Sequence, residues 1–114
     1  MKLEFNQALE NFRQVLEKLC NDALAENHTT LAEIEQIKIE LEPGPKFIRV
    51  VRTVIHKPTG QTQSRSAHCF IEAETGNILK ASAWKAPEKK NPRGNIFNQN
   101  PLGGVTQYGV VYLR

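Results

Sequence analysis

Basic side chains are concentrated in one part of this sequence, where they could bind an anion. Between residues 77 and 104 there are five basic residues and one acidic residue, Glu88. Lysine and arginine at this density attract phosphate or carboxylate groups. Arg93-Gly94-Asn95 combines a forked donor, a glycine that tolerates positive φ and an amide, which suits a backbone nest around an anion. A tight turn at Gly94 explains the same triplet equally well.

Aromatic residues adjoin these cations. The only tryptophan, Trp84, precedes Lys85 at the point where a predicted strand enters the basic segment. A planar ring there can stack on a nucleobase, although a single Trp is more often part of a core. Tyr108 and Tyr112 fall on one face of the last predicted strand. The candidate ligand-binding residues are Arg65, Lys80, Trp84, Lys85, Arg93, Asn95 and Tyr108.

Residues capable of catalysis or metal binding show no convergent pattern. The sequence has no Walker loop, no Gly-x-Ser-x-Gly elbow and no Cys-x-x-Cys pair. His68 and Cys69 are adjacent on a predicted strand, so their side chains should point to opposite faces, with Cys69 in the core. The other histidines, His28 and His56, lie in different segments. We therefore predict no catalytic residue, no cofactor and no metal site.

The first 28 residues are expected to form one amphipathic helix. Its apolar positions alternate in steps of four and three, at Phe5, Leu9, Phe12, Leu16, Leu19 and Ala23. The pattern breaks near Asn27. Thr30-Leu31-Ala32-Glu33 then has the spacing of a capping box for a short helix or turn.

From Ile37 the apolar period changes to two, which is typical of strands. Strands are expected at 37–42, 46–56, 64–73 and 78–84, and the short Pro- and Gly-containing turns between them favour antiparallel neighbours. Residues 37–85 should thus form a four-stranded meander with the helix on one face. Residues 87–104 are expected to be a long basic loop anchored by Ile96, Phe97 and Leu102, and residues 105–114 a closing strand.

The predicted fold class is α+β, in a single domain spanning residues 1–114, with one long N-terminal helix packed on an antiparallel sheet of four to five strands. Charge is segregated along this domain. Residues 1–42 carry four basic and nine acidic residues, for a net charge of −5, whereas residues 43–114 carry eleven and three, for a net charge of +8. No apolar run of about 18 residues and no signal-like segment is present, so we expect neither a membrane protein nor a secreted one. Cys20 and Cys69 are expected to be reduced thiols.

Four segments carry a resemblance to known sequences: Ser64-Arg65-Ser66, Cys69-Phe70-Ile71, the run Leu79-Lys80-Ala81-Ser82-Ala83-Trp84-Lys85-Ala86-Pro87, and Arg93-Gly94-Asn95-Ile96-Phe97. Over residues 46–97, and less clearly over the ending from Tyr108 to Leu113, the chain resembles a family of small hypothetical proteins encoded by tailed bacteriophages and viral metagenome contigs. The acidic helix departs from the shortest members. The resemblance implies a phage accessory protein acting in the host bacterial cytoplasm, and it implies no functional residue.

Three functions are compatible with these features. The first is non-enzymatic binding of a phosphorylated, nucleotide-derived small molecule, such as a host-defence signal that is sequestered. A homo-oligomer is expected in that case, because small binders often bury ligands at subunit interfaces. The second is binding of single-stranded nucleic acid by the same cations and aromatic rings. The third is an interaction module whose acidic helix docks on a host or virion protein.

Overall fold

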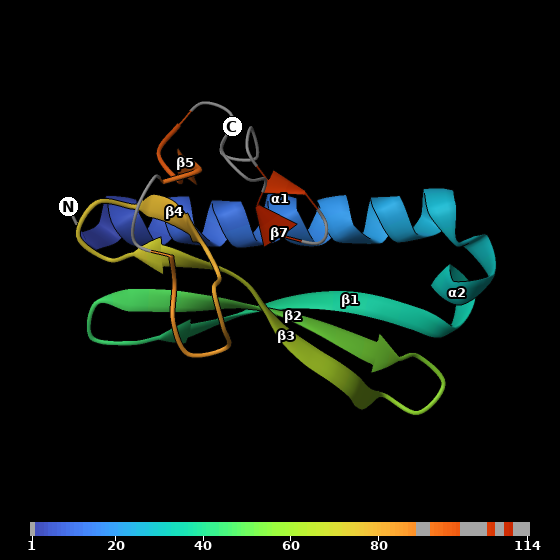
Figure 1. Ribbon diagram of the computed structural model, residues 1–114. Coiled ribbons are helices and arrows are strands. Elements are labelled where there is room, and N and C mark those ends of the chain that lie inside the picture. The colour runs from blue at the N-terminus through green and yellow to red at the C-terminus, as the bar shows by residue number, and fades with distance from the viewer. Residues whose placement is uncertain (1, 89–91, 99–104, 107–108, 111–114) are drawn as a thin grey trace.

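The computed structural model describes residues 2–88, 92–98, 105–106 and 109–110. Two helices, α1 (Lys2–Asn27) and α2 (Thr29–Ile34), precede an antiparallel five-stranded sheet in which strand order follows chain order. Its strands are β1 (Glu35–Pro43), β2 (Phe47–His56), β3 (Gln61–Glu72), β4 (Asn77–Lys80) and β5 (Gly94–Asn95). Because α1 lies across one face of this sheet (Figure 1), the predicted α+β fold is confirmed.

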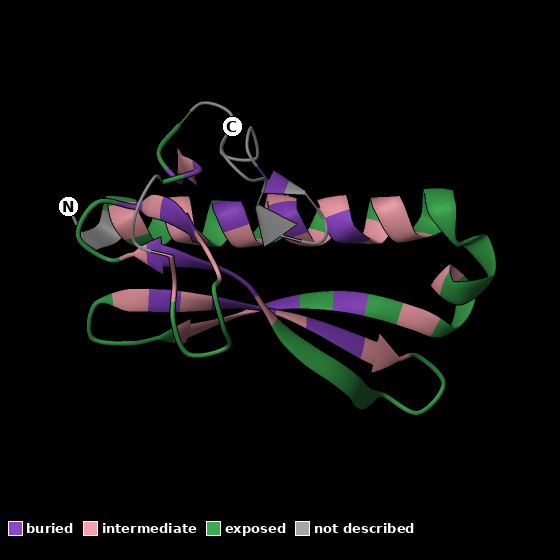
Figure 2. Ribbon diagram, viewed as in Figure 1, coloured by how far each residue is buried: buried purple, intermediate pink, exposed green. Residues whose placement is uncertain are grey.

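The core lies between α1 and the sheet, and buried positions recur along the helix at the predicted spacing (Figure 2). Phe12, Leu16 and Cys20 are buried there, and Phe5 and Leu9 pack at the margin. The strands contribute Ile37, Ile39, Ile48, Val50, Val54, Cys69, Ile71 and Ile78. Within the described part of the chain, no helix is long and apolar enough to cross a membrane.

Polar side chains of α1 complete the hydrogen bonding of β1, which is an edge strand. Asn21 Nδ2 donates to the Ile37 carbonyl at 2.8 Å, and Asn21 Oδ1 accepts from the Ile37 N–H at 2.9 Å. Glu17 Oε2 accepts from the Ile39 N–H at 2.9 Å, and Arg13 donates to the Ile39 carbonyl at 3.4 Å. Unpaired strand edges recruit other strands, and buried backbone groups need partners. The helix therefore takes the place of a neighbouring strand at these two residues.

The short helix α2 forms, but the predicted capping box is wrong. The N-cap residue is His28, whose side chain makes no capping hydrogen bond, so Thr30 already lies inside the helix. The His28 N–H donates to the Leu24 carbonyl at 2.8 Å, and the His28 carbonyl accepts from the Ala32 N–H at 3.0 Å. Backbone hydrogen bonds thus continue from α1 into α2, with only His28 between the two helices.

The strand predicted at 78–84 ends at Lys80. Residues 81–88, which we call the Trp84 turn, fold back so that the Glu88 N–H donates to the Lys80 carbonyl at 2.7 Å and Ala81 pairs with Pro87. Inside the turn, the Ala86 carbonyl accepts from the Ser82 N–H at 3.0 Å. The Trp84 turn lies on the outer face of the sheet, which we define as the face away from α1 (Figure 1).

The segments predicted as a long loop and a closing strand are also organised differently. Strand β5 lies inside the predicted loop and pairs with β4, and Ile96 is buried in the core. In the closing segment, β6 (Val105–Thr106) pairs with β7 (Gly109–Val110) in a separate two-stranded sheet, so one continuous strand is wrong because the chain reverses there. Leu102, Tyr108 and Tyr112 lie outside the described residues.

Replacing Asn21 by alanine should destabilise the protein by about 1–3 kcal/mol, because the N–H and carbonyl of Ile37 lose their partner. Urea unfolding measures this loss. Gln14→Ala is the matched control, since the side chain of Gln14 is exposed and, among the described residues, donates only to Glu10. Its effect should stay within about 0.5 kcal/mol. Equal losses in the two variants would show that Asn21 does not cap the strand edge.

Two glycines with positive φ provide a second stability test. Gly76 has φ +78°, and a Cβ there would lie 2.9 Å from two ring atoms of Phe97. Gly60 has φ +74° and nothing within 4 Å of the added atom. Gly60→Ala should therefore cost about 1 kcal/mol for the left-handed backbone alone, and Gly76→Ala at least about 1 kcal/mol more for the clash. Thermal unfolding measures both, and the difference should narrow in a Phe97→Ala background.

Candidate anion-binding cleft

The outer face of the sheet carries a second, smaller apolar layer. Val51, Phe70 and Leu79 are buried there, outside the core beneath α1, and Thr53 is buried beside them. In β2 the neighbouring Val50 faces α1, which is the alternation expected along a strand. Because the Trp84 turn covers part of this layer, both faces of the central strands are protected from solvent.

A network of ion pairs centred on Glu42 lies at the margin of this layer. Arg49 Nη1 is 2.6 Å from Glu42 Oε1, and Arg65 Nη2 is 2.8 Å from Glu42 Oε2. Arg65 Nε also lies 3.7 Å from Glu40 Oε1, which accepts a hydrogen bond from the Thr53 hydroxyl at 2.6 Å. Hydrogen bonds from Arg65 and Arg49 hold the pKa of Glu42 below its ordinary value. The network therefore keeps this carboxylate charged and fixes both guanidinium groups.

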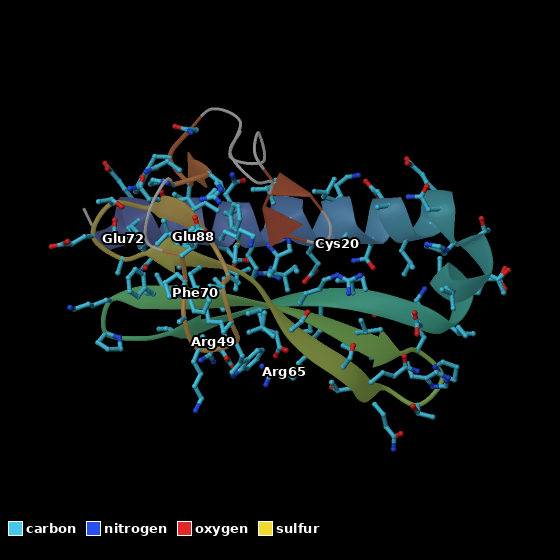
Figure 3. All side chains as sticks on the ribbon, viewed as in Figure 1. Cys20, Arg49, Arg65, Phe70, Glu72 and Glu88 are labelled. Atoms are coloured by element: carbon cyan, nitrogen blue, oxygen red, sulfur yellow. The ribbon has the colours of Figure 1, made fainter. Side chains whose placement is uncertain are left out.

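Trp84 is held by the same two arginines. The Arg49 guanidinium carbon is 4.4 Å from the centre of the Trp84 ring, and the Arg65 guanidinium carbon is 5.7 Å from it. Arg49 Nε also donates to the Trp84 carbonyl at 2.8 Å. Both arginines lie on the outer face, away from α1 (Figure 3). Trp84 as a whole remains 38% exposed, so a ligand can still reach it.

Beside this network is an open cleft of about 360 Å³ at the β1–β2 turn. Its charged lining consists of Lys46, Arg49 and Lys85 against one carboxylate, Glu42, so the local charge is positive. Phe47 and Phe70 supply its aromatic surface. Neither lysine amine forms a hydrogen bond or ion pair with any residue that the structure describes. The cleft thus offers two uncommitted cations next to an arginine fixed by Trp84.

The predicted nest at Arg93-Gly94-Asn95 is wrong. Gly94 does not have positive φ and lies in β5, opposite Ile78. The Arg93 N–H donates to the Ile78 carbonyl at 2.8 Å, and the Arg93 side chain is only 3% exposed and pairs with Glu88 at 3.3 Å. Strand pairing therefore uses the backbone donor that a nest would offer to an anion.

Asn95 has a structural role in the same region. Its amide donates to the Thr75 carbonyl at 2.9 Å and to Asn77 Oδ1 at 3.0 Å, and its Oδ1 accepts from the Phe97 N–H at 2.8 Å. These bonds link the β3–β4 turn to the segment that follows β5. The amide group of Asn95 therefore forms its hydrogen bonds within the protein.

Of the predicted site residues, the structure brings Arg65, Trp84 and Lys85 to one region of the outer face. Lys80 ends β4 opposite Cys69, and Arg93 and Asn95 lie at β5, apart from the cleft lining. Sequence reasoning missed Lys46 and the role of Glu42. A signal existed, because the short Pro-Gly-Pro connection between β1 and β2 sets the register that places Glu42 opposite Arg49.

Cys20 and Cys69 are both buried, and they are not joined in a disulfide. Cys69 lies in the core as predicted, next to a β-bulge in which His68 is the extra residue of β3. Burial raises the pKa of both Cys20 and Cys69, so both thiols stay protonated near neutral pH. Among the described residues, no group of three or more histidine, cysteine or acidic side chains is placed to hold a metal ion.

The fold and the cleft define a small α+β protein whose sheet is covered by a long helix on one face and by the Trp84 turn and a cationic cleft on the other. The chain belongs to the family described as "Family of unknown function (DUF7717)", whose sequence pattern matches residues 2–107. Comparison with curated proteins and with solved structures found no match.

Glu42→Gln should remove a pH-dependent part of the stability. Because the folded-state pKa of Glu42 lies below the ordinary value of 4.5, its ion pairs stabilise the fold above pH 4.5, and this contribution is lost as the pH falls through the lowered value. Urea unfolding from pH 7 to pH 2 should show the variant to be less stable at pH 7 and equal to the wild type in strong acid. Glu33→Gln, at an exposed position in α2, is the control. A constant difference across this range would contradict the assignment.

Proposed function

We propose that the chain binds a phosphorylated small molecule derived from a nucleotide in the cleft at the β1–β2 turn, without chemical turnover. One observation carries this proposal. Arg49 is fixed against the exposed ring of Trp84, and it lines a cleft with Lys46 and Lys85, whose amines have no partner among the described residues. Cations fixed beside aromatic surface suit a ligand that joins a phosphate to a planar base.

Each group has a role in this proposal. Lys46 and Lys85 act as flexible point charges for a phosphate, and Arg49 adds planar donors whose direction Glu42 sets. Phe47, which lines the cleft, and the partly exposed Trp84, which contacts Arg49, offer rings for a base. Arg65 positions the Glu42 carboxylate and the Trp84 ring and does not contact the ligand. The site proposed from the structure is therefore shifted from the predicted one toward the β1–β2 turn.

The cleft volume agrees with this class of ligand. Pockets for small molecules usually enclose about 300–1,000 Å³, and the volume of 360 Å³ here is at the lower end of that range. The cleft is also open to solvent on one side. A second copy of the chain could cover it, which is why the homo-oligomer stays part of the proposal. The resemblance to phage proteins supports sequestration of a host nucleotide signal in the bacterial cytoplasm as the biological setting.

Trp84 provides the test, because the chain contains one tryptophan. Adenosine, guanosine and uridine 5′-monophosphates, each compared with its nucleoside, are titrated while Trp fluorescence is followed. Saturable binding is expected for the nucleotides and at least about tenfold weaker binding for the nucleosides, since the charged hydrogen bonds are lost. Lys46→Gln/Lys85→Gln should weaken nucleotide binding to the same degree. Lys18→Gln on α1, which pairs with Asp22 at the surface, is the control.

The outcome separates the alternatives. Binding that survives the double lysine substitution, or no binding of any nucleotide, would contradict the proposal. A single-stranded oligonucleotide that binds more tightly than the mononucleotides, with an affinity that falls steeply as salt rises, would favour nucleic-acid binding instead. Loss of a protein partner on reversal of the α1 surface charges, with nucleotide binding absent, would favour the interaction module.

A further inference from the structure

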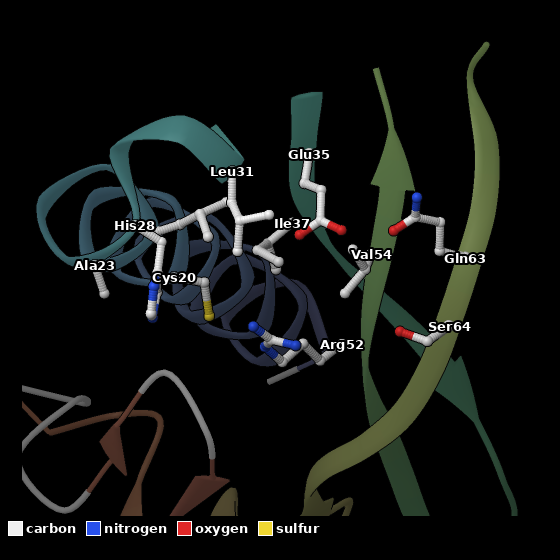
Figure 4. A pocket seen from close by; sticks show the side chains of 11 residues that line it. Cys20, Ala23, His28, Leu31, Glu35, Ile37, Arg52, Val54, Gln63 and Ser64 are labelled. Carbon is white, nitrogen blue, oxygen red and sulfur yellow. The ribbon is translucent and has the colours of Figure 1, made fainter. Parts of the chain in front are cut away.

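A second cavity lies on the opposite side of the sheet, between α1, α2 and the strands. Its volume is about 400 Å³. Figure 4 shows it beneath the end of α1, where the sheet diverges from the helix. Its apolar walls are Ala23 and Leu24 of α1, Leu31 of α2, Ile37 of β1 and Val54 of β2. Leu31 is 40% exposed at this position, so apolar surface faces solvent at the cavity.

One guanidinium group enters this apolar space. Arg52 lies on the face of β2 that contacts α1, opposite Ile39, which is buried in the core. Its side chain points into the cavity beneath the helix (Figure 4). There it lies near the Cys20 thiol, and its positive charge lowers the pKa of Cys20 against the larger opposing effect of burial.

We propose that this cavity binds a monocarboxylic acid with an apolar chain, whose carboxylate pairs with Arg52 and whose chain lies against Ala23, Leu31 and Val54. Arginine presents two parallel donors that match the two oxygens of a carboxylate. The chain would cover the apolar surface that Leu31 now exposes. The site differs from the nucleotide cleft in its face of the sheet, its lining and its ligand.

The charge inside the cavity selects a monoanion over a phosphate. The titratable groups that line it are Arg52, Glu35, His28 and the protonated Cys20 thiol. One guanidinium against one carboxylate leaves no net charge to hold a dianion, whereas a carboxylate close to Arg52 gains a short-range pair. Gln63 and Ser64 line the β3 side and add neutral polar groups. The apolar walls favour a hydrocarbon chain over a sugar or a base.

Sodium octanoate and octanamide are the probes, and the full chain is titrated by calorimetry and by ¹H–¹⁵N NMR. Octanoate is expected to bind at least tenfold more tightly than octanamide, with amide shifts confined to residues near Cys20, Leu31 and Val54. Arg52→Gln should remove this preference, whereas Arg52→Lys should keep part of it. Lys18→Gln, at the exposed surface of α1, should change nothing.

A second variant keeps the test decisive if Arg52→Gln does not fold. Ala23→Met fills the cavity from α1 and should weaken octanoate binding at least tenfold while Arg52 remains. Equal affinity for octanoate and octanamide, shifts centred on the Trp84 turn, or wild-type affinity in Ala23→Met would overturn the proposal. Because Trp84 lies on the other face, nucleotide binding followed by its fluorescence can fail or succeed independently.

Discussion

The fold depends on how α1 satisfies the open edge of β1. Asn21 and Glu17 bond to backbone groups of Ile37 and Ile39, so the helix is fixed along the strand as well as against the sheet. Apolar packing alone is non-directional and would allow the helix to slide or rotate. The hydrogen bonds specify one arrangement, in which Phe12 and Leu16 are buried. The same arrangement assigns the side chains of Ile37 and Ile39 to the core and those of Glu40 and Glu42 to the outer face.

That assignment changes the meaning of the charge segregation along the chain. The acidic first third and the basic remainder suggest two surfaces of opposite sign, but antiparallel pairing brings them together. Glu42 of β1 lies opposite Arg49 of β2, and Arg65 of β3 reaches the same carboxylate. The charges of Arg49 and Arg65 are thus paired within the sheet. Lys46 and Lys85 are cations of the outer face whose amines bond to no described residue, which is why the proposed site moves to the β1–β2 turn.

The helix, the strands β1–β3 and their antiparallel order could be predicted, because long segments repeat their apolar period many times. The Arg93-Gly94-Asn95 triplet could not be placed, since a two-residue strand such as β5 has no period of its own. The two bulges in β3 could not be predicted from the sequence either. At Gln63 and at His68 an extra residue shifts the register against β2, and each shift changes which side chains share a face. Trp84 could be selected from the sequence by its residue type. Its contact with Arg49 could not be predicted, because the contact depends on the chain folding back after Lys80.

Strand β2 contributes one arginine to each of the two proposed sites. It lies inside the sheet between β1 and β3, and its side chains are buried on both faces. A charged residue in such a strand destabilises the fold unless specific partners compensate for its desolvation. Arg49 and Arg52 are three residues apart, so they project to opposite faces, one beside Trp84 and one beside Cys20. The two proposed ligands would each use one of these arginines, so the alternation of side chains along β2 keeps the two proposed sites on opposite faces of the sheet.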